Sequence, residues 1–226
     1  MIPGSLNTMM MGVGIPQDYI ALWLMAGDST DETGSYDITL NGGAVQNSDY
    51  VDYDGVNDYG QSGRLAFNSN EFTIVMRVMF NAMDTTEGLW IANSRSASSG
   101  AAKEWQFYLS LNSLSYPKLT VIDSETGTNQ EATWNFTPSL AVWYVFSLRF
   151  TGSDIEIYEG NSLVASTSFV GTMNTGSSHT QFAKRGWDTV APRAYGNINQ
   201  SRSIAYDRAL SVSELTSVIS LIDTGA

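Results

Sequence analysis

The sequence predicts an all-β protein, an antiparallel two-sheet sandwich with a short C-terminal helix. Three observations lead to this prediction: short segments in which apolar and polar residues alternate, turns containing glycine and asparagine between them, and one segment near the C-terminus with helical spacing. Alternation with a period of two residues is typical of strands that bury one face of an antiparallel sheet. Several such strands at close spacing indicate a sandwich or a barrel.

The alternation is clearest in residues 72–80, 105–111 and 143–150. The first segment (FTIVMRVMF) has five large apolar side chains on one face: Phe72, Ile74, Met76, Val78 and Phe80. The third segment (WYVFSLRF) repeats the pattern with Tyr144, Phe146, Leu148 and Phe150. Three tryptophans fit the same strand patterns and are therefore expected in the core: Trp23, Trp105 and Trp143.

The turns and the helix complete this reading of the chain. Residues 151–153 (TGS) and 159–161 (EGN) each separate two strand-like segments, and Gly and Asn tolerate the positive φ that tight hairpins need. Ser211 followed by Glu214 forms a capping box. An apolar stripe follows at helical spacing, namely Leu215, Val218, Ile219 and Ile222. This helix should pack on the sandwich and close it.

The composition excludes several classes of function. The chain has 226 residues, a net charge of −12 and no cysteine. Disulfides and thiolate metal sites are therefore excluded. A chain this acidic is repelled by phosphate backbones, so we expect no nucleic-acid partner. No apolar run reaches the roughly 18 residues of a membrane helix, so we expect no membrane insertion.

Two segments are expected along the chain. Residues 1–18 are interpreted as an N-terminal arm because they are rich in Met and Gly, contain prolines and have no strand or helix period. The arm up to residue 17 has no Lys or Arg, so it lacks the positive region of a signal peptide. Residues 19–226 are interpreted as one sandwich domain, since no repeat and no linker divides them. Exposed methionines would be a liability on a free monomer, so we expect the arm to dock on a partner chain.

Several motifs occur in an order typical of one family. Residues 21–24 (ALWL) precede an Asp- and Gly-containing turn, and residues 53–59 (YDGVNDY) follow it. Residues 196–199 (GNIN) and 204–211 (IAYDRALS) precede the expected helix. In this order the motifs resemble those of laminin-G-like, or concanavalin A-like, jelly-roll domains over most of the chain. The resemblance implies a jelly-roll sandwich that binds glycans or proteins, without implying one function. Asn199 departs from the Asp that is usual in that family.

Residues 154–159 (DIEIYE) bear on catalysis, because concanavalin-like glucanases carry a Glu-x-Asp-x-x-Glu strand. Here the order is Asp154, Glu156 and Glu159, so the residue types are swapped. On a regular strand Glu156 and Glu159 point to opposite faces. Retaining glycosidases need two carboxyl groups roughly 5 Å apart. We therefore expect that the protein is not an enzyme, with a glycoside hydrolase kept as the last alternative.

A loop-like segment around Trp187 offers the best candidate ligand site. A loop tryptophan beside arginine and aspartate can stack on a sugar and hydrogen-bond its hydroxyl groups; the alternative is a tryptophan that folds back onto the core. The candidate residues are Arg185, Trp187, Asp188, Arg193 and Tyr195, with Trp90 from another segment. The acidic chain favours a neutral glycan over a polyanion.

Calcium is the ion that the acidic turns would hold, since it is bound by six to eight oxygen ligands. The candidate ligands are Asp28, Asp31 and Glu32. The alternative is that these residues only form turns through hydrogen bonds to their own backbone.

Taken together, these features favour a structural or binding protein. We expect an exposed component of a virus particle, such as a phage head-decoration or tail-appendage subunit, located at the virion surface. Its partners would be other subunits of the assembly, reached through the arm, further copies of itself, and cell-surface glycan. The alternative from another class is an extracellular carbohydrate-binding or adhesion module of a cellular protein.

Overall fold

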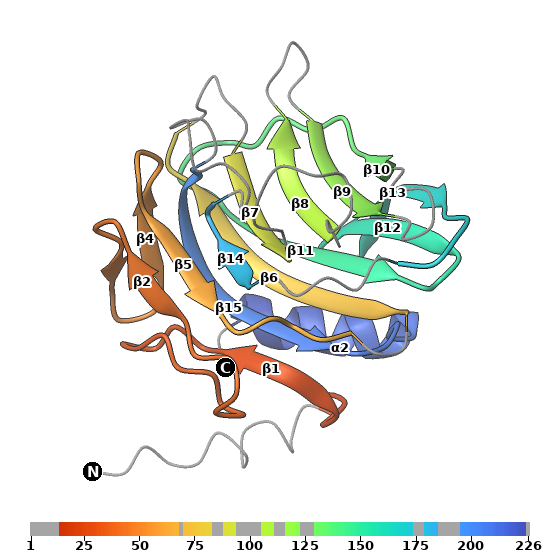
Figure 1. Ribbon diagram of the computed structural model, residues 1–226, viewed down its shortest axis with the longest axis horizontal. Helices are drawn as coiled ribbons and strands as arrows, with labels where there is room; N and C mark the ends of the chain where they lie inside the picture. Colours follow the sequence, from red (N-terminus) through yellow and green to blue (C-terminus); the bar gives the residue numbers. More distant parts are fainter. Residues whose placement is uncertain are drawn as a thin grey trace.

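The computed structural model describes residues 14–67, 70–82, 88–93, 105–110, 116–122, 129–173, 179–184 and 195–224. In this part of the chain strands dominate, and two antiparallel sheets lie face to face (Figure 1). The predicted all-β, two-sheet sandwich with a short C-terminal helix is confirmed.

The first sheet has eight strands in the order β13-β12-β11-β6-β15-β4-β3, with β1 paired to β15. Its strands are β1 (Tyr19–Trp23), β3 (Val45–Gln46), β4 (Val51–Asp54), β6 (Phe72–Phe80), β11 (Trp143–Phe150), β12 (Asp154–Glu159), β13 (Ser162–Ser168) and β15 (Asn197–Tyr206). The long strands β6, β11 and β15 form its centre, so segments far apart in sequence pair there.

The second sheet has seven strands in the order β10-β9-β8-β7-β14-β5-β2. These strands are β2 (Thr39–Asn41), β5 (Tyr59–Ser62), β7 (Gly88–Asn93), β8 (Trp105–Ser110), β9 (Tyr116–Ile122), β10 (Asn129–Thr133) and β14 (Thr180–Phe182). The short strand β14 lies between β7 and β5 and connects the two halves of this sheet.

The main core fills the space between the two sheets. It contains all five apolar residues predicted for one face of β6 and, from β11, Phe146, Leu148 and Phe150, with Tyr144 packed at its margin. Trp23 is fully buried there, and its indole Nε1 donates to the Tyr36 carbonyl oxygen at 2.7 Å. The alternation in these strands thus predicted the inward faces correctly.

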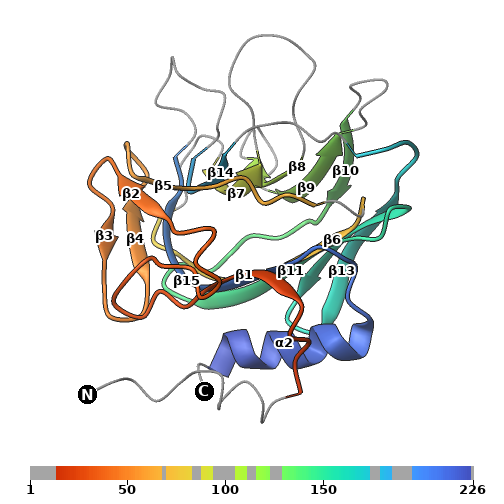
Figure 2. The ribbon, with the colours of Figure 1, turned by 60° about the horizontal axis from the view of Figure 1, so that its bottom comes forward.

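Helix α2 (Val212–Thr224) covers the outer face of the eight-stranded sheet (Figure 2). The predicted stripe is confirmed, because Leu215, Val218, Ile219 and Ile222 are buried in a second cluster with Val75 of β6. The capping box is also confirmed, since the Ser211 backbone N donates to Glu214 Oε2 at 2.8 Å and the Glu214 backbone N donates to Ser211 Oγ at 3.3 Å. Among the described residues, no helix is long and apolar enough to cross a membrane.

One expectation about a single residue needs correction, and one is not tested. Trp143 was expected in the core, but it is half-buried on the outer face of β11, where the Arg77 guanidinium carbon lies 4.2 Å from its ring centroid. The prediction of a strand was correct, but the alternation places Trp143 on the face opposite Phe146 and Leu148, which point into the core. Trp105 lies on β8, where side chains are outside the described residues.

The boundary of the expected arm also shifts. Ile15 is 5% exposed and packs in the second cluster, and the Tyr206 hydroxyl donates to the Pro16 carbonyl oxygen at 3.1 Å. The described part of the arm therefore belongs to the folded domain, because Ile15 contributes to the apolar contacts around α2. Residues 1–13 lie outside the described residues, and their role as an arm stays a prediction.

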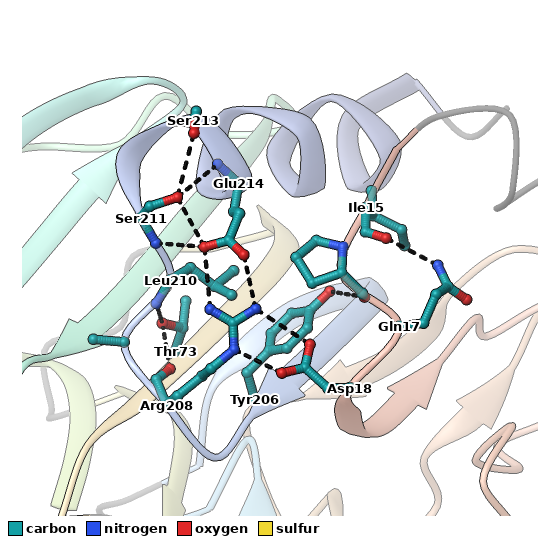
Figure 3. Close-up of polar contacts among 12 residues, drawn as sticks. Ile15, Gln17, Asp18, Thr73, Tyr206, Arg208, Leu210, Ser211, Ser213 and Glu214 are labelled. Atoms are coloured by element: carbon teal, nitrogen blue, oxygen red, sulfur yellow. Dashed lines mark hydrogen bonds and ion pairs between the residues drawn. The ribbon is translucent and has the colours of Figure 1, made fainter.

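A cluster of ionic hydrogen bonds centred on Arg208 joins both ends of the domain (Figure 3). The Arg208 Nε donates to Asp18 Oδ2 at 2.7 Å, and its Nη2 donates to Glu214 Oε1 at 2.8 Å. Through these contacts the N-terminal segment is connected to the first turn of α2. These hydrogen bonds, together with that from Ser211, hold the pKa of Glu214 at about 2, and the hydrogen bond from Arg208 lowers the pKa of Asp18.

We predict that this cluster loses its stabilising effect in acid. Because the folded-state pKa of Glu214 is lowered from 4.5 to about 2, its contribution is complete above 4.5 and is lost as the pH falls towards 2. The Glu214→Gln variant should be less stable than the wild type at about pH 7, and the difference should shrink below pH 4.5. Urea unfolding across this pH range measures it. Glu32→Gln, at an exposed position, is the control, and a constant difference at all pH values would contradict the prediction.

Candidate ligand-binding site

The candidate loop begins and ends at a short antiparallel bridge between Lys184 and Tyr195. The Gly196 backbone N donates to the Ala183 carbonyl oxygen at 2.9 Å and strengthens this closure. Ala183 has a φ of 57°, a left-handed conformation that a residue other than glycine rarely adopts. The chain therefore turns sharply after β14, and this turn places Lys184 opposite Tyr195.

Two tyrosine rings surround the Lys184 ammonium group. Its Nζ lies 3.9 Å from the ring centroid of Tyr59, at the start of β5, and 5.8 Å from that of Tyr195. The two ring centroids are 6.3 Å apart with an interplanar angle of 40°. Burial lowers the pKa of Lys184 from its ordinary value. Such cation–π contacts stabilise a half-buried cation.

Strand β5 can pack over Tyr53 and Ile38 because the residue after Tyr59 is Gly60. A Cβ on Gly60 would lie 2.9 Å from the Tyr53 hydroxyl and 2.8 Å from Ile38 Cγ2. Glycine therefore allows the fully buried Tyr53 to pack beneath β5. The same strand then presents Tyr59, which is half-buried, beside Lys184.

The structure describes only part of the predicted ligand site. Tyr195 is in the cluster with Tyr59 and Lys184. The other predicted residues lie outside the described residues, namely Arg185, Trp187, Asp188 and Arg193. Trp90 lies on β7, the neighbour of β14 in the sheet, and its side chain is also outside the described residues.

Tyr59 and Lys184 were not predicted as site residues. Tyr59 was interpreted only as part of the YDGVNDY motif, and Lys184 was given no role in a site. The signal that could have identified Lys184 is its place at the start of the loop that Tyr195 ends.

The three candidate calcium ligands have separate surroundings. Asp31 is 4% exposed, and its Oδ1 accepts a hydrogen bond from the Leu22 backbone N at 2.7 Å. Its Oδ2 accepts from the backbone N of Ser35 at 3.2 Å and of Tyr36 at 3.1 Å, and from the Thr33 hydroxyl. Asp28 and Glu32 are exposed, and Asp28 Oδ1 accepts from the Thr30 hydroxyl at 2.7 Å. Asp31 thus shapes the turn, and within the described ranges no group of three acidic or histidine side chains could hold a metal ion.

The acidic residues of β12 take part in structural contacts. Glu156 Oε2 accepts from Arg149 Nη1 at 2.6 Å and from the Tyr158 hydroxyl at 3.1 Å. Arg149 Nε also donates to the Leu210 carbonyl oxygen at 2.7 Å, so this ion pair supports the segment that leads into α2. Burial raises the pKa of Glu159, which ends the strand.

Comparisons with known proteins place the fold but not a family. No family model matches the chain, and no curated protein matches it either. Solved structures do match. The receptor-binding domain of botulinum neurotoxin C/D mosaic serotype has a TM-score of 0.69 at 10% identity, over 90% of this chain and 51% of that one. The receptor-binding domain of botulinum neurotoxin type G has a TM-score of 0.68 at 14% identity, over 91% and 51%. The chain is therefore similar in fold to β-sandwich, lectin-like domains and spans about half the length of these proteins.

A third similar structure corrects the expectation about catalysis. Trypanosoma rangeli sialidase, solved with 2,3-difluorosialic acid as a covalent intermediate, matches with a TM-score of 0.69 at 14% identity, over 93% of this chain and 34% of that one. A sialidase is a glycoside hydrolase, so this sandwich also occurs within an enzyme. The expectation that the chain is not an enzyme was wrong as an inference from the fold and the swapped carboxylates.

We predict that Asp31 is a structural residue of the turn after β1. Replacing Asp31 by Ala removes the acceptor of three backbone N–H groups and should lower the free energy of unfolding by about 2–4 kcal/mol, with or without calcium. Asp28→Ala, at an exposed position, should cost less than about 1 kcal/mol. Chemical unfolding with calcium and with a chelator measures both. A calcium-dependent gain in wild-type stability that is absent in Asp31→Ala would instead support the metal prediction.

Proposed function

We propose that this chain is a glycan-binding module. The observation that carries the proposal is the cluster of Tyr59, Lys184 and Tyr195 at the base of the segment 185–194. Aromatic rings stack on the C–H faces of sugars, and an adjacent ammonium group donates hydrogen bonds to sugar oxygens. The predicted residues Arg185, Trp187, Asp188 and Arg193 come between Lys184 and Tyr195 in the sequence, so we include them in the proposed site.

The similar structures support a glycan as the ligand class. One is described as the binding domain of botulinum neurotoxin DC in complex with SialylT, and another as the serotype D ligand-binding domain in complex with N-acetylneuraminic acid. These complexes are properties of those proteins. They make glycans the first class to test here, because the same kind of sandwich occurs in proteins that bind them.

We also propose that the module acts in many copies on a larger assembly, such as the surface of a virus particle, with display by an adhesion protein of a cell as the alternative. A single sugar site on an open surface has an affinity of around millimolar, which becomes useful only through multivalency. Residues 1–13 are proposed as the anchor, because Ile15 and Asp18 fix the segment that follows them to the domain. Neighbouring subunits of the assembly would be the partners of this arm.

The glycan site makes a direct prediction. On a multivalent glycan array, Tyr59→Ala, Lys184→Gln and Trp187→Ala should each weaken binding at least about tenfold, because each removes a stacking ring or a hydrogen-bond donor. His179→Ala is the control, since His179 is exposed and lies at the other end of β14. Binding that survives all three substitutions would place the site elsewhere, and no binding by the wild type would contradict the proposed function.

The anchoring role predicts the behaviour of a truncated chain. A chain beginning at Gly14 should unfold with the same free energy as the full chain, because Ile15 and the Asp18–Arg208 contact are kept. It should lose assembly, measured by light scattering after size-exclusion chromatography. Equal assembly by both chains would contradict the role of residues 1–13.

A further inference from the structure

A second cluster of aromatic and cationic side chains lies on the outer face of the eight-stranded sheet. Arg77 of β6 stacks on Trp143 of β11, with 4.2 Å from the guanidinium carbon to the ring centroid. The ring centroid of Tyr50, just before β4, lies 6.1 Å from that of Trp143, at an interplanar angle of 64°. We call Tyr50, Arg77 and Trp143 the outer-face cluster. It shares no residue with the Lys184 cluster.

Arg77 differs from the arginines that stabilise the fold. Arg149 and Arg208 donate to carboxylates at 2.6 and 2.7 Å. The Arg77 Nε is buried and has no hydrogen-bond partner, and the Asp223 carboxylate oxygen is 3.9 Å away. Its side chain is 21% exposed. The guanidinium thus lies over the indole ring, and the donor capacity of its Nε is unused.

The charges around the cluster restrict what can bind there. Arg202 of β15 adds a second positive charge, and burial together with the nearby charge of Arg77 lowers the pKa of Arg202. Burial also lowers the pKa of Arg77, and the nearby carboxylates of Asp223 and Asp49 oppose this lowering in part. A polyanion or an acidic tract would meet these two carboxylates and be repelled, whereas one carboxylate can approach the guanidinium. The site therefore suits a ligand with a single negative charge.

From this geometry we infer that the outer-face cluster binds a sugar that carries one carboxylate, at the end of a glycan chain. The inference rests on the proposed glycan-binding function and adds a second site with a defined ligand class. A planar guanidinium pairs with a carboxylate through two parallel hydrogen bonds. Trp143 and Tyr50 supply aromatic surface for the C–H groups of the sugar ring. An acidic peptide shares the carboxylate but is disfavoured by Asp49 and Asp223.

The test uses the full chain and a readout specific to this site. In ¹H–¹⁵N NMR spectra the Arg77 Nε–H and the Trp143 indole N–H report on the cluster, and spectra of Arg77→Lys and Trp143→Phe assign them. Free N-acetylneuraminic acid should shift both signals, and its uncharged methyl ester should shift them at least about tenfold more weakly, because it lacks the charge that pairs with Arg77. Arg77→Gln should weaken the acid's effect on the indole signal to the same degree. Lys184→Gln makes a matched charge change at the other cluster and should leave these shifts unchanged.

The outcomes separate this inference from the proposed function. Unchanged Arg77 and Trp143 signals would overturn the inference, and the proposed function would stand if glycan-array binding is still lost in Lys184→Gln. Equal shifts by the acid and its methyl ester would also overturn it. A short peptide with one aspartate that binds more tightly than the sugar acid would assign the cluster to a protein partner instead. Absence of array binding together with unchanged signals would overturn both proposals.

Discussion

The structure depends on burial of the eight-stranded sheet from both sides. Strand β6 is buried at every residue from Phe72 to Met76, with Ile74 in the main core and Val75 in the cluster under α2. A sheet with apolar residues on both faces needs a covering layer on each, because exposed apolar surface costs free energy in water. The other sheet covers one face, and α2, with Ile15, covers part of the other. The helix is therefore a structural requirement of the sheet.

The end of that covering layer separates two chemical environments on one sheet face. Towards α2, the outward residues of β6 and β11 are buried and include Val75 and Val145 together with the polar Thr73 and Ser147. Near the last turn of the helix they become Arg77, Met79 and Trp143, all half-buried, with Asp223 of α2 close to Arg77. The change follows the strand sequence, so the outward side chains are small and buried where the helix lies, and larger, with one charged and one aromatic group, beyond it. The contacts around Arg208 hold the helix and thereby fix this division.

The sequence predicts the fold well because its signals are local. The alternation in residues 72–80 and 143–150, and the capping box at Ser211 and Glu214, depend on neighbours in the chain and were found as expected. The position of Trp143 was misjudged because alternation tells which residues share a face but not what covers that face. The burial of Ile15 was missed for a different reason, because a single apolar residue between glycine and proline shows no strand or helix period.

The candidate site was harder to predict because it forms between distant segments. Tyr59 and Lys184 are adjacent only because β5 pairs with β14, a pairing that no local pattern in the sequence indicates. The same holds for Arg77 and Trp143, which come together through the register of β6 and β11. Acidic residues in turns were equally ambiguous, since a carboxylate such as Asp31 can bind calcium or accept hydrogen bonds from backbone N–H groups, and the structure shows these hydrogen bonds.

Three of the arginines in the eight-stranded sheet and its C-terminal extension, Arg77, Arg149 and Arg208, show how context assigns a role to one residue type. In Arg149 and Arg208 the guanidinium is engaged by carboxylates of the same chain, so its hydrogen bonds stabilise the native state. In Arg77 the Nε is buried without a hydrogen-bond partner. Removing such a donor from water without replacing its hydrogen bonds costs free energy. Stacking on Trp143 offsets part of this cost. The carboxylate of the inferred ligand would pair with this guanidinium, and the relief of that cost would add to its affinity.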